Sequence, residues 1–550
     1  MGDTDAGSIK KVIIAAVASV LLVAAIISVI VATTYNRARS EVVSTSKAVE
    51  AICSPTRYKA TCQHSLSKAN TTDHRKLIET AITAAVGDVR AVLASSAVLL
   101  EAAKDPATKG AFAVCRDVLA RAVRDLRRSV RKVGGAFADA ARARAHVSDI
   151  RTWLSAVVAN QETCLDAFRN TTGDAGERME RLLKTARELS SNGLAMVTDF
   201  PEYVGGGGRK MVVKEGGVFV GRRLADTASL KPSIVVAKDG GGDFKTINDA
   251  LASLPKRSND SFVVIHIKAG VYSENVEIPE GLNKIVFVGD GPSATRLTGK
   301  RSVAGGHQTY YTATLAISGE DFLGKDLGVE NTAGPDGYQA LAVRVSGDRC
   351  ILHNVRMDGY QDTLCADTHR QYYSNCTVTG TIDFVFGNGL ALFQDCTFVT
   401  RKPGPGQECV VTAQGRSDHK SNDAFIIQNS RFTAEPAFLA VRPRIASYLG
   451  RPWKKLSRTI IMESEIGEFI EPKGWATWIG TFGLDTCFYV EYENRGPGAN
   501  TTGRVTWKGI HSLKGEQINS WTGGVVYGGD DWIRDSGVPY VPTMMQVKGN

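Results

Sequence analysis

Residues 351–399 read ILHNVRMDGYQDTLCADTHRQYYSNCTVTGTIDFVFGNGLALFQDCTFV, and a short unit recurs within them. Each copy has an apolar residue, a polar residue, then Asn or an acid, and then returns to apolar residues. The copies are Leu352-His353-Asn354, Tyr373-Ser374-Asn375 and Phe393-Gln394-Asp395. Short β-rich runs separated by Asn and Gly turns are typical of a parallel β-solenoid, in which each coil repeats the one before it.

The spacing of this unit is regular. Asn354, Asn375 and Asp395 follow one another at intervals of 21 and 20 residues, and copies at Asn429 and Glu463 follow at intervals of 34. An interval near 20 suits one coil of short strands, and a longer interval suits a coil with one expanded loop. The competing fold is an antiparallel sandwich, which requires a hairpin about every 8–12 residues, and hairpin signals are scarce here. We therefore expect a parallel solenoid from about residue 234 onward.

Four polar residues share the spacing of the coils. Gln339, Gln361 and Asp383 follow one another at intervals of 22 residues, and Asp362 precedes Asp383 by 21. Residues one coil apart lie about 4.8 Å from each other across neighbouring strands, so these side chains are expected to meet on one face. Two carboxylates that close do not both ionise readily, which makes one an acid and leaves the other an anion. The two amides can donate hydrogen bonds to a developing oxyanion.

Between about residues 45 and 200 the apolar residues recur at helical spacing. The segments 82–93, 115–130, 150–158 and 179–189 predict four amphipathic helices packed as a bundle. Four Cys lie in this part of the chain. A bundle outside the cytosol can use them as two disulfides, Cys53 with Cys62 and Cys115 with Cys164.

The second helical segment carries arginines on the face opposite its apolar stripe. They are Arg116, Arg121, Arg124, Arg127, Arg128 and Arg131. We expect this face to be solvated, because charge runs on a helix usually meet water. The alternative is a surface for an acidic partner.

Residues 201–231 are predicted to be a linker. They contain the run Gly205-Gly206-Gly207-Gly208, the pair Arg209-Lys210 and the stretch Arg222-Arg223-Leu224-Ala225. Glycine runs give flexible, exposed backbone, and a basic pair in a secreted linker is a candidate site for a processing protease. The alternative is an uncut joint.

Residues 1–40 are predicted to be a signal anchor or a signal peptide. Segment 12–32 contains 21 residues without a charge, and Lys10-Lys11 precede it. At about 1.5 Å per residue, such a helix spans a bilayer core of roughly 30 Å. We favour the anchor, because the run is long and no clean cleavage site follows. Both alternatives send the chain into the secretory route, with which five Asn-x-Ser/Thr sequons are compatible, at Asn70, Asn170, Asn259, Asn375 and Asn500.

Composition limits the class of protein. The 550 residues are enough for about three to four domain-sized units. A hydrophobic share of 43% and a charged share of 22% exclude wholesale disorder and a multi-spanning membrane protein. The formal charge of +9 is too small to indicate nucleic acid as a partner. None of the nine His has metal-site spacing and no Gly-x-Ser-x-Gly elbow occurs, so we expect no metal, no cofactor and no serine-hydrolase mechanism.

Five motifs in the second half carry a resemblance to a known family. They are Gly270-Val271-Tyr272-Ser273-Glu274, Gln339-Ala340-Leu341-Ala342-Val343, Gln361-Asp362-Thr363-Leu364, Asp383-Phe384-Val385-Phe386-Gly387 and Leu449-Gly450-Arg451-Pro452-Trp453. On these motifs the second half resembles the plant pectin methylesterases (pectinesterases), carbohydrate esterases built on a right-handed parallel β-helix. The helical half resembles the pectin methylesterase inhibitor domain, a pro-region in many such proteins. The resemblance implies a multidomain chain, with an inhibitor-like four-helix bundle at 41–200 and a catalytic β-helix at 232–550.

The resemblance also implies roles for single residues. Asp383 would be the nucleophile, Asp362 the acid and then the base, and Gln339 and Gln361 the oxyanion donors. Arg451 would orient the ionised Asp383 carboxylate. Substrate contacts are implied for Thr309, Gln339, Arg451 and Trp453.

For the cysteines and the other tryptophans the expectations are mixed. The resemblance implies a disulfide between Cys376 and Cys396, which lie one coil apart in sequence. Cys365 stands where the family commonly has an aromatic residue, and Cys350 could pair with it. The pairing of Cys409 and Cys487 is left open. Trp475 and Trp478 are expected in the core or at the rim rather than in a subsite.

The implied activity is hydrolysis of the methyl esters of homogalacturonan in cell-wall pectin, which yields free carboxylate and methanol. The implied partners are this polymer, inhibitor proteins and a processing protease at Arg222-Arg223, with membrane contact only through the N-terminal segment. The implied location is the cell wall, reached by secretion, with anchoring in a membrane before processing. Two alternatives stay open: another β-helix enzyme that degrades pectin, and a pectin-binding or esterase-inhibiting wall protein without catalysis.

Overall fold

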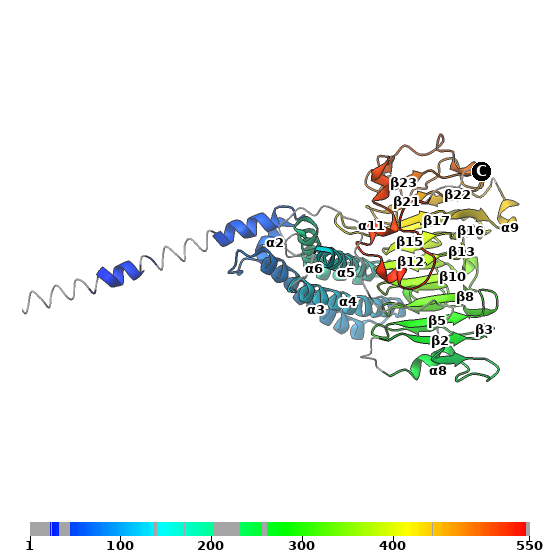
Figure 1. The fold of residues 1–550 in the computed structure, drawn as a ribbon, viewed down its shortest axis with the longest axis horizontal. Coiled ribbons are helices and arrows are strands. Elements are labelled where there is room, and N and C mark those ends of the chain that lie inside the picture. Colours follow the sequence, from blue (N-terminus) through cyan, green and yellow to red (C-terminus); the bar gives the residue numbers. More distant parts are fainter. Residues whose placement is uncertain are drawn as a thin grey trace, which may run out of the picture.

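The structure is a computed structural model, and it describes residues 44–135, 140–169, 171–201, 231–255, 261–442 and 444–545, with a few residues of a helix between 23 and 33. The predicted linker, apart from its two end residues, lies outside the described residues, and so does most of segment 12–32. Figure 1 shows two bodies, a group of helices and a long stack of strands, with the helices packed against one side of the stack.

The helices form the N-terminal domain. Their bounds are α2 (Lys59–Ser65), α3 (His74–Ala102), α4 (Pro106–Val133), α5 (Ala140–Asp166) and α6 (Ala175–Asp199). Two of them begin at an aspartate that accepts a backbone hydrogen bond. Asp73 accepts from the Arg75 N–H at 2.9 Å and Asp105 accepts from the Thr108 N–H at 2.8 Å, as N-cap residues do. The helices α3 to α6 contain the four predicted segments, which confirms the helical prediction.

The apolar stripes of these helices meet in one core. Its fully buried members include Ile82 of α3, Leu119 of α4, Leu154 of α5 and Leu183 of α6. Both predicted disulfides, Cys53–Cys62 and Cys115–Cys164, are present, and the second joins α4 to α5. Among the described residues, α3 is the one helix whose length and composition would allow it to cross a membrane, and it contributes to this core.

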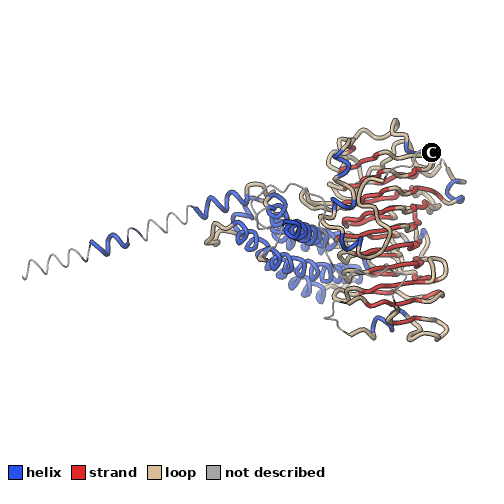
Figure 2. Tube along the Cα trace, in the orientation of Figure 1, coloured by secondary structure: helices blue, strands red, loops and turns tan. Residues whose placement is uncertain are grey.

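The strands are stacked along one axis (Figure 2). Their pairings form three parallel ladders. The first consists of β1 (Ile234–Val236), β2 (Val263–Ile267), β5 (Ile285–Gly289), β8 (Leu323–Asn331), β10 (Cys350–Asp358), β12 (Arg370–Ser374), β15 (Leu390–Gln394), β18 (Ala424–Gln428), β21 (Arg458–Met462), β23 (Phe488–Tyr492) and β24 (Ile510–His511). The second shares β8 and β10 and adds β3 (Gly270–Tyr272), β6 (Thr295–Gly299), β13 (Thr377–Gly380), β16 (Thr397–Thr400), β19 (Arg431–Ala434) and β22 (Glu465–Ile466). The third is a separate sheet of β4 (Val276–Ile278), β7 (Leu315–Ile317), β9 (Val343–Val345), β11 (Leu364–Ala366), β14 (Val385–Gly387), β17 (Cys409–Gln414) and β20 (Ser447–Gly450).

The register of the first ladder confirms the predicted repeat. Cys350 pairs with Gln371, Gln371 with Ala391, Ala391 with Phe425, and Phe425 with Thr459. These steps are the predicted intervals of 21, 20, 34 and 34 residues. Every ladder between the described strands is parallel, so the architecture is a parallel β-helix and the antiparallel sandwich is excluded.

The recurring unit corresponds to a corner of the coil. Its third residues, Asn354, Asn375, Asp395, Asn429 and Glu463, all have φ between 46° and 56°. Asn and Asp tolerate this left-handed conformation better than most residues, which explains why the unit contains them. Side chains at this corner also bond between coils, since Asn354 Nδ2 donates to Asp326 Oδ1 at 2.6 Å and Asn429 Nδ2 donates to Asp395 Oδ1 at 2.7 Å.

The β-helix has an interior core of its own. In it the Tyr373 ring stacks on Phe393 of the next coil, with centroids 4.5 Å apart. The outer face of the first ladder is covered by the C-terminal segment, which contains α10 (Glu516–Asn519), α11 (Gly523–Val526) and α12 (Asp531–Arg534). Two further short helices are α8 (Ile247–Ala252) and α9 (Pro436–Leu439). Each domain has a nearly separate core. The exceptions are Tyr310 and Tyr311 of the β-helix, which pack in the core of the helical domain.

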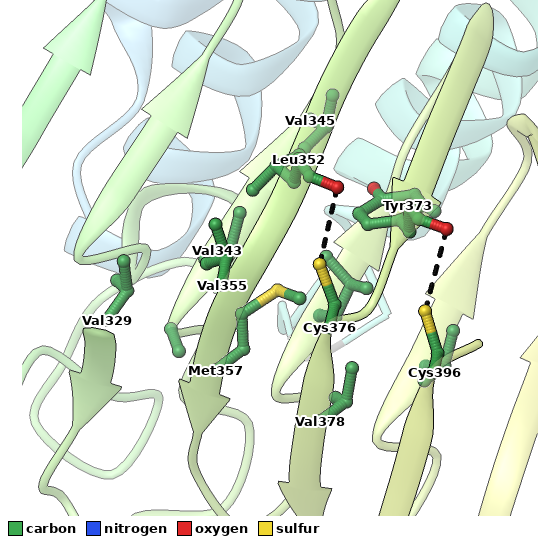
Figure 3. Packing of buried hydrophobic residues seen from close by; sticks show 14 of the residues in the cluster. Val329, Val343, Val345, Leu352, Val355, Met357, Tyr373, Cys376, Val378 and Cys396 are labelled. Atoms are coloured by element: carbon green, nitrogen blue, oxygen red, sulfur yellow. Dashed lines mark hydrogen bonds between the residues drawn. The ribbon is translucent and has the colours of Figure 1, made fainter. Parts of the chain in front are cut away.

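The predicted disulfide between Cys376 and Cys396 is wrong. Both thiols are free and buried, and Figure 3 shows each directed at a backbone carbonyl. Cys376 Sγ lies 3.3 Å from Leu352 O, and Cys396 Sγ lies 3.5 Å from Tyr373 O. Cys350, Cys365, Cys409 and Cys487 are also free and buried, so the suggested pair of Cys350 with Cys365 is absent too.

The arginine face of α4 does not simply meet water. Arg121 and Arg128 lie at the boundary with the β-helix, where Arg121 Nη2 donates to Tyr310 Oη at 2.6 Å. Arg128 pairs with Glu320 and its Nη2 lies 2.9 Å from His369 Nε2. The acidic partner of this face is therefore the second domain of the same chain, and the expectation of a solvated face is wrong for these arginines.

Candidate active site

The third ladder places the two predicted acids at equivalent positions on neighbouring coils. Leu364 of β11 pairs with Val385 of β14, a step of 21 residues, and Asp362 and Asp383 each precede these residues by two positions. Both acids have positive φ, 64° for Asp362 and 48° for Asp383, so the chain turns sharply just before each strand. The Asp362 N–H donates to Ile382 O at 3.0 Å, which ties the two turns together.

Asp383 is held by one guanidinium group. Arg451 Nε donates to Asp383 Oδ1 at 2.8 Å, and Arg451 Nη2 donates to Asp383 Oδ2 at 2.6 Å. Arg451 follows β20, two coils beyond β14 in the same ladder. A two-point contact of this kind fixes the plane of the carboxylate as well as its charge.

Burial and charge act differently on the two acids. Asp362 is 8% exposed and Asp383 is 5% exposed. Burial, and then the negative charge of Asp383, raise the pKa of Asp362 well above its usual range. Burial also raises the pKa of Asp383, but the Arg451 guanidinium acts in the opposite direction through its charge and its hydrogen bonds. When the pair carries one proton, the proton is therefore expected on Asp362.

All seven residues predicted for the site line one cavity of about 240 Å³. They are Thr309, Gln339, Gln361, Asp362, Asp383, Arg451 and Trp453. The floor of the cavity is apolar, because Leu341, Cys365, Phe386 and Ala413 line it and belong to one small buried cluster that Trp453 packs against. The cluster consists of Ala313, Ala316, Leu341, Cys365, Phe386 and Ala413. A pair of acids, two amides and an apolar floor can bind an uncharged ester and attack its carbonyl group.

The two tryptophans expected in the core or at the rim differ in burial, since Trp478 is partly exposed and Trp475 is buried. Trp478 also lines the cavity, and the Arg451 guanidinium carbon lies 4.5 Å from the centroid of one of its rings. The ring therefore braces the arginine that holds Asp383. Trp475, in contrast, is 1% exposed and stacks on Tyr489 in the interior, as expected for a core residue. Nothing in the spacing of Trp478 distinguishes it from Trp475, since its position depends on how the loop after β22 folds.

The helical domain supplies one wall of the cavity. Its contributions are Val114, Thr163, Asp166, Ala167 and Arg169. At one side α4 packs on the segment before β7, where Tyr311 Oη donates to Asp117 Oδ2 at 2.7 Å. At another side the C-terminal end of α5 packs on the segment after β20, where Lys454 Nζ donates to Asp166 Oδ1 at 2.7 Å. The acids of the site thus lie beneath a second domain.

Among the residues that the structure describes, no group of three or more His, Cys, Asp or Glu side chains is placed to hold a metal ion.

Comparisons with known proteins agree on both domains. Residues 233–530 match the family model described as Pectinesterase, and residues 47–196 match the model described as Plant invertase/pectin methylesterase inhibitor. An Arabidopsis thaliana protein named "Probable pectinesterase/pectinesterase inhibitor 58" is 41% identical over 561 residues, which cover 97% of this chain and 98% of the relative. The protein "Pectinesterase" of Petunia integrifolia is 45% identical over 375 residues, covering 67% of this chain and all of the relative.

A solved structure resembles the β-helix. "Pectin methylesterase from Carrot" is 41% identical, with a TM-score of 0.57, and the match covers 58% of this chain and 100% of the carrot chain. The whole carrot chain thus corresponds to little more than half of this one.

Proposed function

The chain belongs to the pectinesterase family and carries an inhibitor-family domain at its N-terminus, and on this premise we propose how its residues hydrolyse the methyl esters of pectin. The activity is that of a pectinesterase, a carboxylic ester hydrolase that converts methyl esters of pectin to carboxylates. Membership of this family argues against the two alternatives, another β-helix enzyme that degrades pectin and a wall protein without catalysis.

The first half of the reaction forms an acyl-enzyme. An oxygen of the Asp383 carboxylate attacks the carbonyl carbon of a 6-O-methyl galacturonate, and the carbonyl electrons move to its oxygen. The side-chain amides of Gln339 and Gln361 donate hydrogen bonds to that oxyanion. When the oxyanion collapses, the bond to the methoxy group breaks and Asp362 gives its proton to the departing oxygen, so methanol leaves. Asp383 and the galacturonate are then joined as an anhydride.

The second half returns the enzyme to its starting state. Asp362, now a carboxylate, takes a proton from water, and the hydroxide attacks the galacturonate carbonyl of the anhydride. The bond to Asp383 breaks, so Asp383 recovers its negative charge while Asp362 keeps the proton. The new galacturonic acid releases its own proton to solvent. Trp453 and Thr309 contact the sugar chain in this scheme.

One observation carries the proposal: Arg451 bonds both oxygens of Asp383, and Asp362 lies one coil away with its pKa raised well above the usual range by burial and by the Asp383 charge. This pairing gives an oriented anion and a neutral acid in the same cavity. The test is methanol release from methylated pectin, measured for the full chain and for the chain without residues 1–230. We expect release by the shortened chain, and its absence would contradict the proposal.

The helical domain is proposed to be an intramolecular inhibitor. Supporting this, it contributes Val114 and Asp166 to the wall of the cavity that contains Asp383. Cleavage at Arg222-Arg223 would separate it from the catalytic part. Sequencing the N-terminus of the protein secreted by a plant cell tests this step, and recovery of uncut chain alone would contradict it.

The remaining parts of the organisation are proposals as well. We infer a signal anchor or signal peptide at 1–40, an inhibitor-like four-helix bundle at 41–200, a processed linker at 201–231 and a catalytic β-helix at 232–550. Right-handed winding is supported by the strong preference of parallel crossovers for that hand. Plant pectinesterases act in the cell wall, and we propose secretion as the route, with membrane contact through residues 12–32 before processing.

A further inference from the structure

Lys454 lies beside the cavity and faces two acids of the other domain. Its Nζ donates to Asp166 Oδ1 at 2.7 Å and to Glu162 Oε2 at 3.2 Å. The side chains are largely covered, with 10% of Lys454, 9% of Glu162 and 14% of Asp166 exposed. Burial alone would raise the pKa of Glu162, but the ammonium of Lys454 and the guanidinium of Arg187 lower it below the usual range. A covered cation thus lies between two carboxylates.

Both acidic partners of Lys454 come from α5, and the described part of the β-helix offers it no third. When the helical domain leaves, this ammonium loses both counter-charges at once. A cation so placed either returns to water or binds another anion. In the freed catalytic domain Lys454 is therefore a cation without the two acidic partners it has in the uncut chain.

The position of Lys454 connects this site to the catalytic cavity. Its Nζ lies 5.4 Å from the centroid of a Trp453 ring, and Trp453 packs edge-on against Phe386 of the cavity floor at 5.8 Å between centroids. Asp166, which bonds Lys454, is itself a wall of the cavity that Asp362 and Asp383 line. A sugar chain that reaches from Asp383 across Trp453 would bring a neighbouring unit toward the ammonium.

We propose that Lys454 forms a subsite for the free carboxylate of a demethylated galacturonate near the reacting ester, and that Glu162 and Asp166 occupy this subsite in the uncut chain. The inference rests on the proposed function, because a galacturonan chain is the source of the carboxylate. Methyl esters are uncharged and gain nothing from an ammonium group, whereas a carboxylate does. Since each turnover creates one more carboxylate, the subsite favours esters close to units that are already demethylated.

The test uses the β-helix freed from the helical domain, which is justified by its own core and by the carrot protein, whose entire chain matches this part alone. The substrates are hexagalacturonates, one with every unit methylated and one with half of the units free. Methanol release gives kcat and KM for each. We expect the wild type to prefer the half-methylated oligomer by about five- to tenfold in kcat/KM, as for a partly covered ionic hydrogen bond.

Three variants separate the subsite from a structural role. For Lys454→Gln, the ratio of kcat/KM for the half-methylated oligomer to that for the fully methylated one should fall close to one, mainly because KM for the half-methylated oligomer rises. Lys454→Arg should keep most of the wild-type ratio. Lys455→Gln is the matched control, because this neighbouring lysine is exposed and should retain the wild-type preference. A Lys454→Gln enzyme with the wild-type preference would overturn the proposal.

A second measurement needs no variant and covers the case in which Lys454→Gln does not fold. Fully demethylated hexagalacturonate should inhibit the wild type competitively, and the inhibition should weaken about tenfold between low salt and 0.5 M salt. Absence of inhibition would overturn the subsite. If the wild type releases no methanol from any substrate, the proposed function itself fails, so the two failures are distinguishable.

Discussion

Arg451 bonds both carboxylate oxygens of Asp383, with Nε at 2.8 Å from Oδ1 and Nη2 at 2.6 Å from Oδ2. The guanidinium carbon lies 4.5 Å from the centroid of a Trp478 ring, so the fork has a support on its other side. The arrangement keeps the Asp383 carboxylate in one plane and opposes the effect of burial on its pKa. Orientation and ionisation of the nucleophile thus depend on the same residue.

Substitutions of Arg451 separate these two effects. Arg451→Lys keeps a positive charge but loses the planar fork, so we expect kcat to fall about tenfold with little change in the acidic limb of the pH–rate profile. Arg451→Ala loses both, and kcat should fall about 10²-fold or more. Without the guanidinium the pKa of the pair rises, so the acidic limb should move to higher pH. An alanine variant with wild-type kcat and an unmoved limb would remove Arg451 from the mechanism.

We expect Asp362 to lower the stability of the β-helix at neutral pH. Burial and Asp383 raise its pKa well above the usual range. Near pH 3 Asp362 is protonated in both the folded and the unfolded chain, so its ionisation does not change the free energy of unfolding. As the pH rises past about 4, the unfolded chain releases this proton more readily than the folded chain, which favours unfolding. Asp362→Asn should therefore raise Tm of the β-helix by about 2 °C or more at pH 7 but not at pH 3, while methanol release nearly stops. Equal Tm values at pH 7 would contradict this.

The β-helix could be predicted from the sequence because its coils stack at a regular interval. Every coil must stack on the one before, so the corner residues Asn354 and Asn375 repeat at the interval that the strand register later shows. The same rule paired Asp362 with Asp383, because residues 21 apart here occupy equivalent positions on neighbouring coils of the third ladder. The helical disulfides could be predicted because Cys115 lies on one predicted helical segment and Cys164 follows another by a few residues, while Cys53 and Cys62 are only 9 residues apart.

Other features could not be predicted from the sequence, because they depend on contacts between distant parts of the chain. The solvated face expected for Arg121 and Arg128 meets the β-helix instead, since docking of the two domains decides which face of α4 is covered. Trp478 reaches the site through a loop. The Cys376–Cys396 disulfide was inferred from resemblance, and the thiols of this chain bond backbone carbonyls instead.

The contact between the domains should depend on Arg128. Its guanidinium pairs with Glu320, lies 2.9 Å from His369 Nε2 and covers the Trp153 ring at 4.1 Å. With the linker cut, Arg128→Ala should weaken binding of the helical domain to the β-helix about ten- to hundredfold, because it removes an ion pair and a hydrogen-bond contact that cross the boundary between the domains. Calorimetric titration measures this. Arg127→Ala is the control, since Arg127 is exposed on the same helix. Equal affinities for the two variants would contradict the role of Arg128.

The central claim is that Asp383 is the nucleophile, and one substitution tests it most directly. Asp383→Asn has nearly the same shape, but an amide oxygen does not form the acyl-enzyme. The matched control is Asp395→Asn at a corner of the coil, where an amide oxygen can still accept the hydrogen bond from Asn429. Methanol release by the freed β-helix should fall below a few per cent of wild type for Asp383→Asn and stay near wild type for Asp395→Asn. A folded Asp383→Asn enzyme that still releases methanol at a substantial rate would contradict the mechanism.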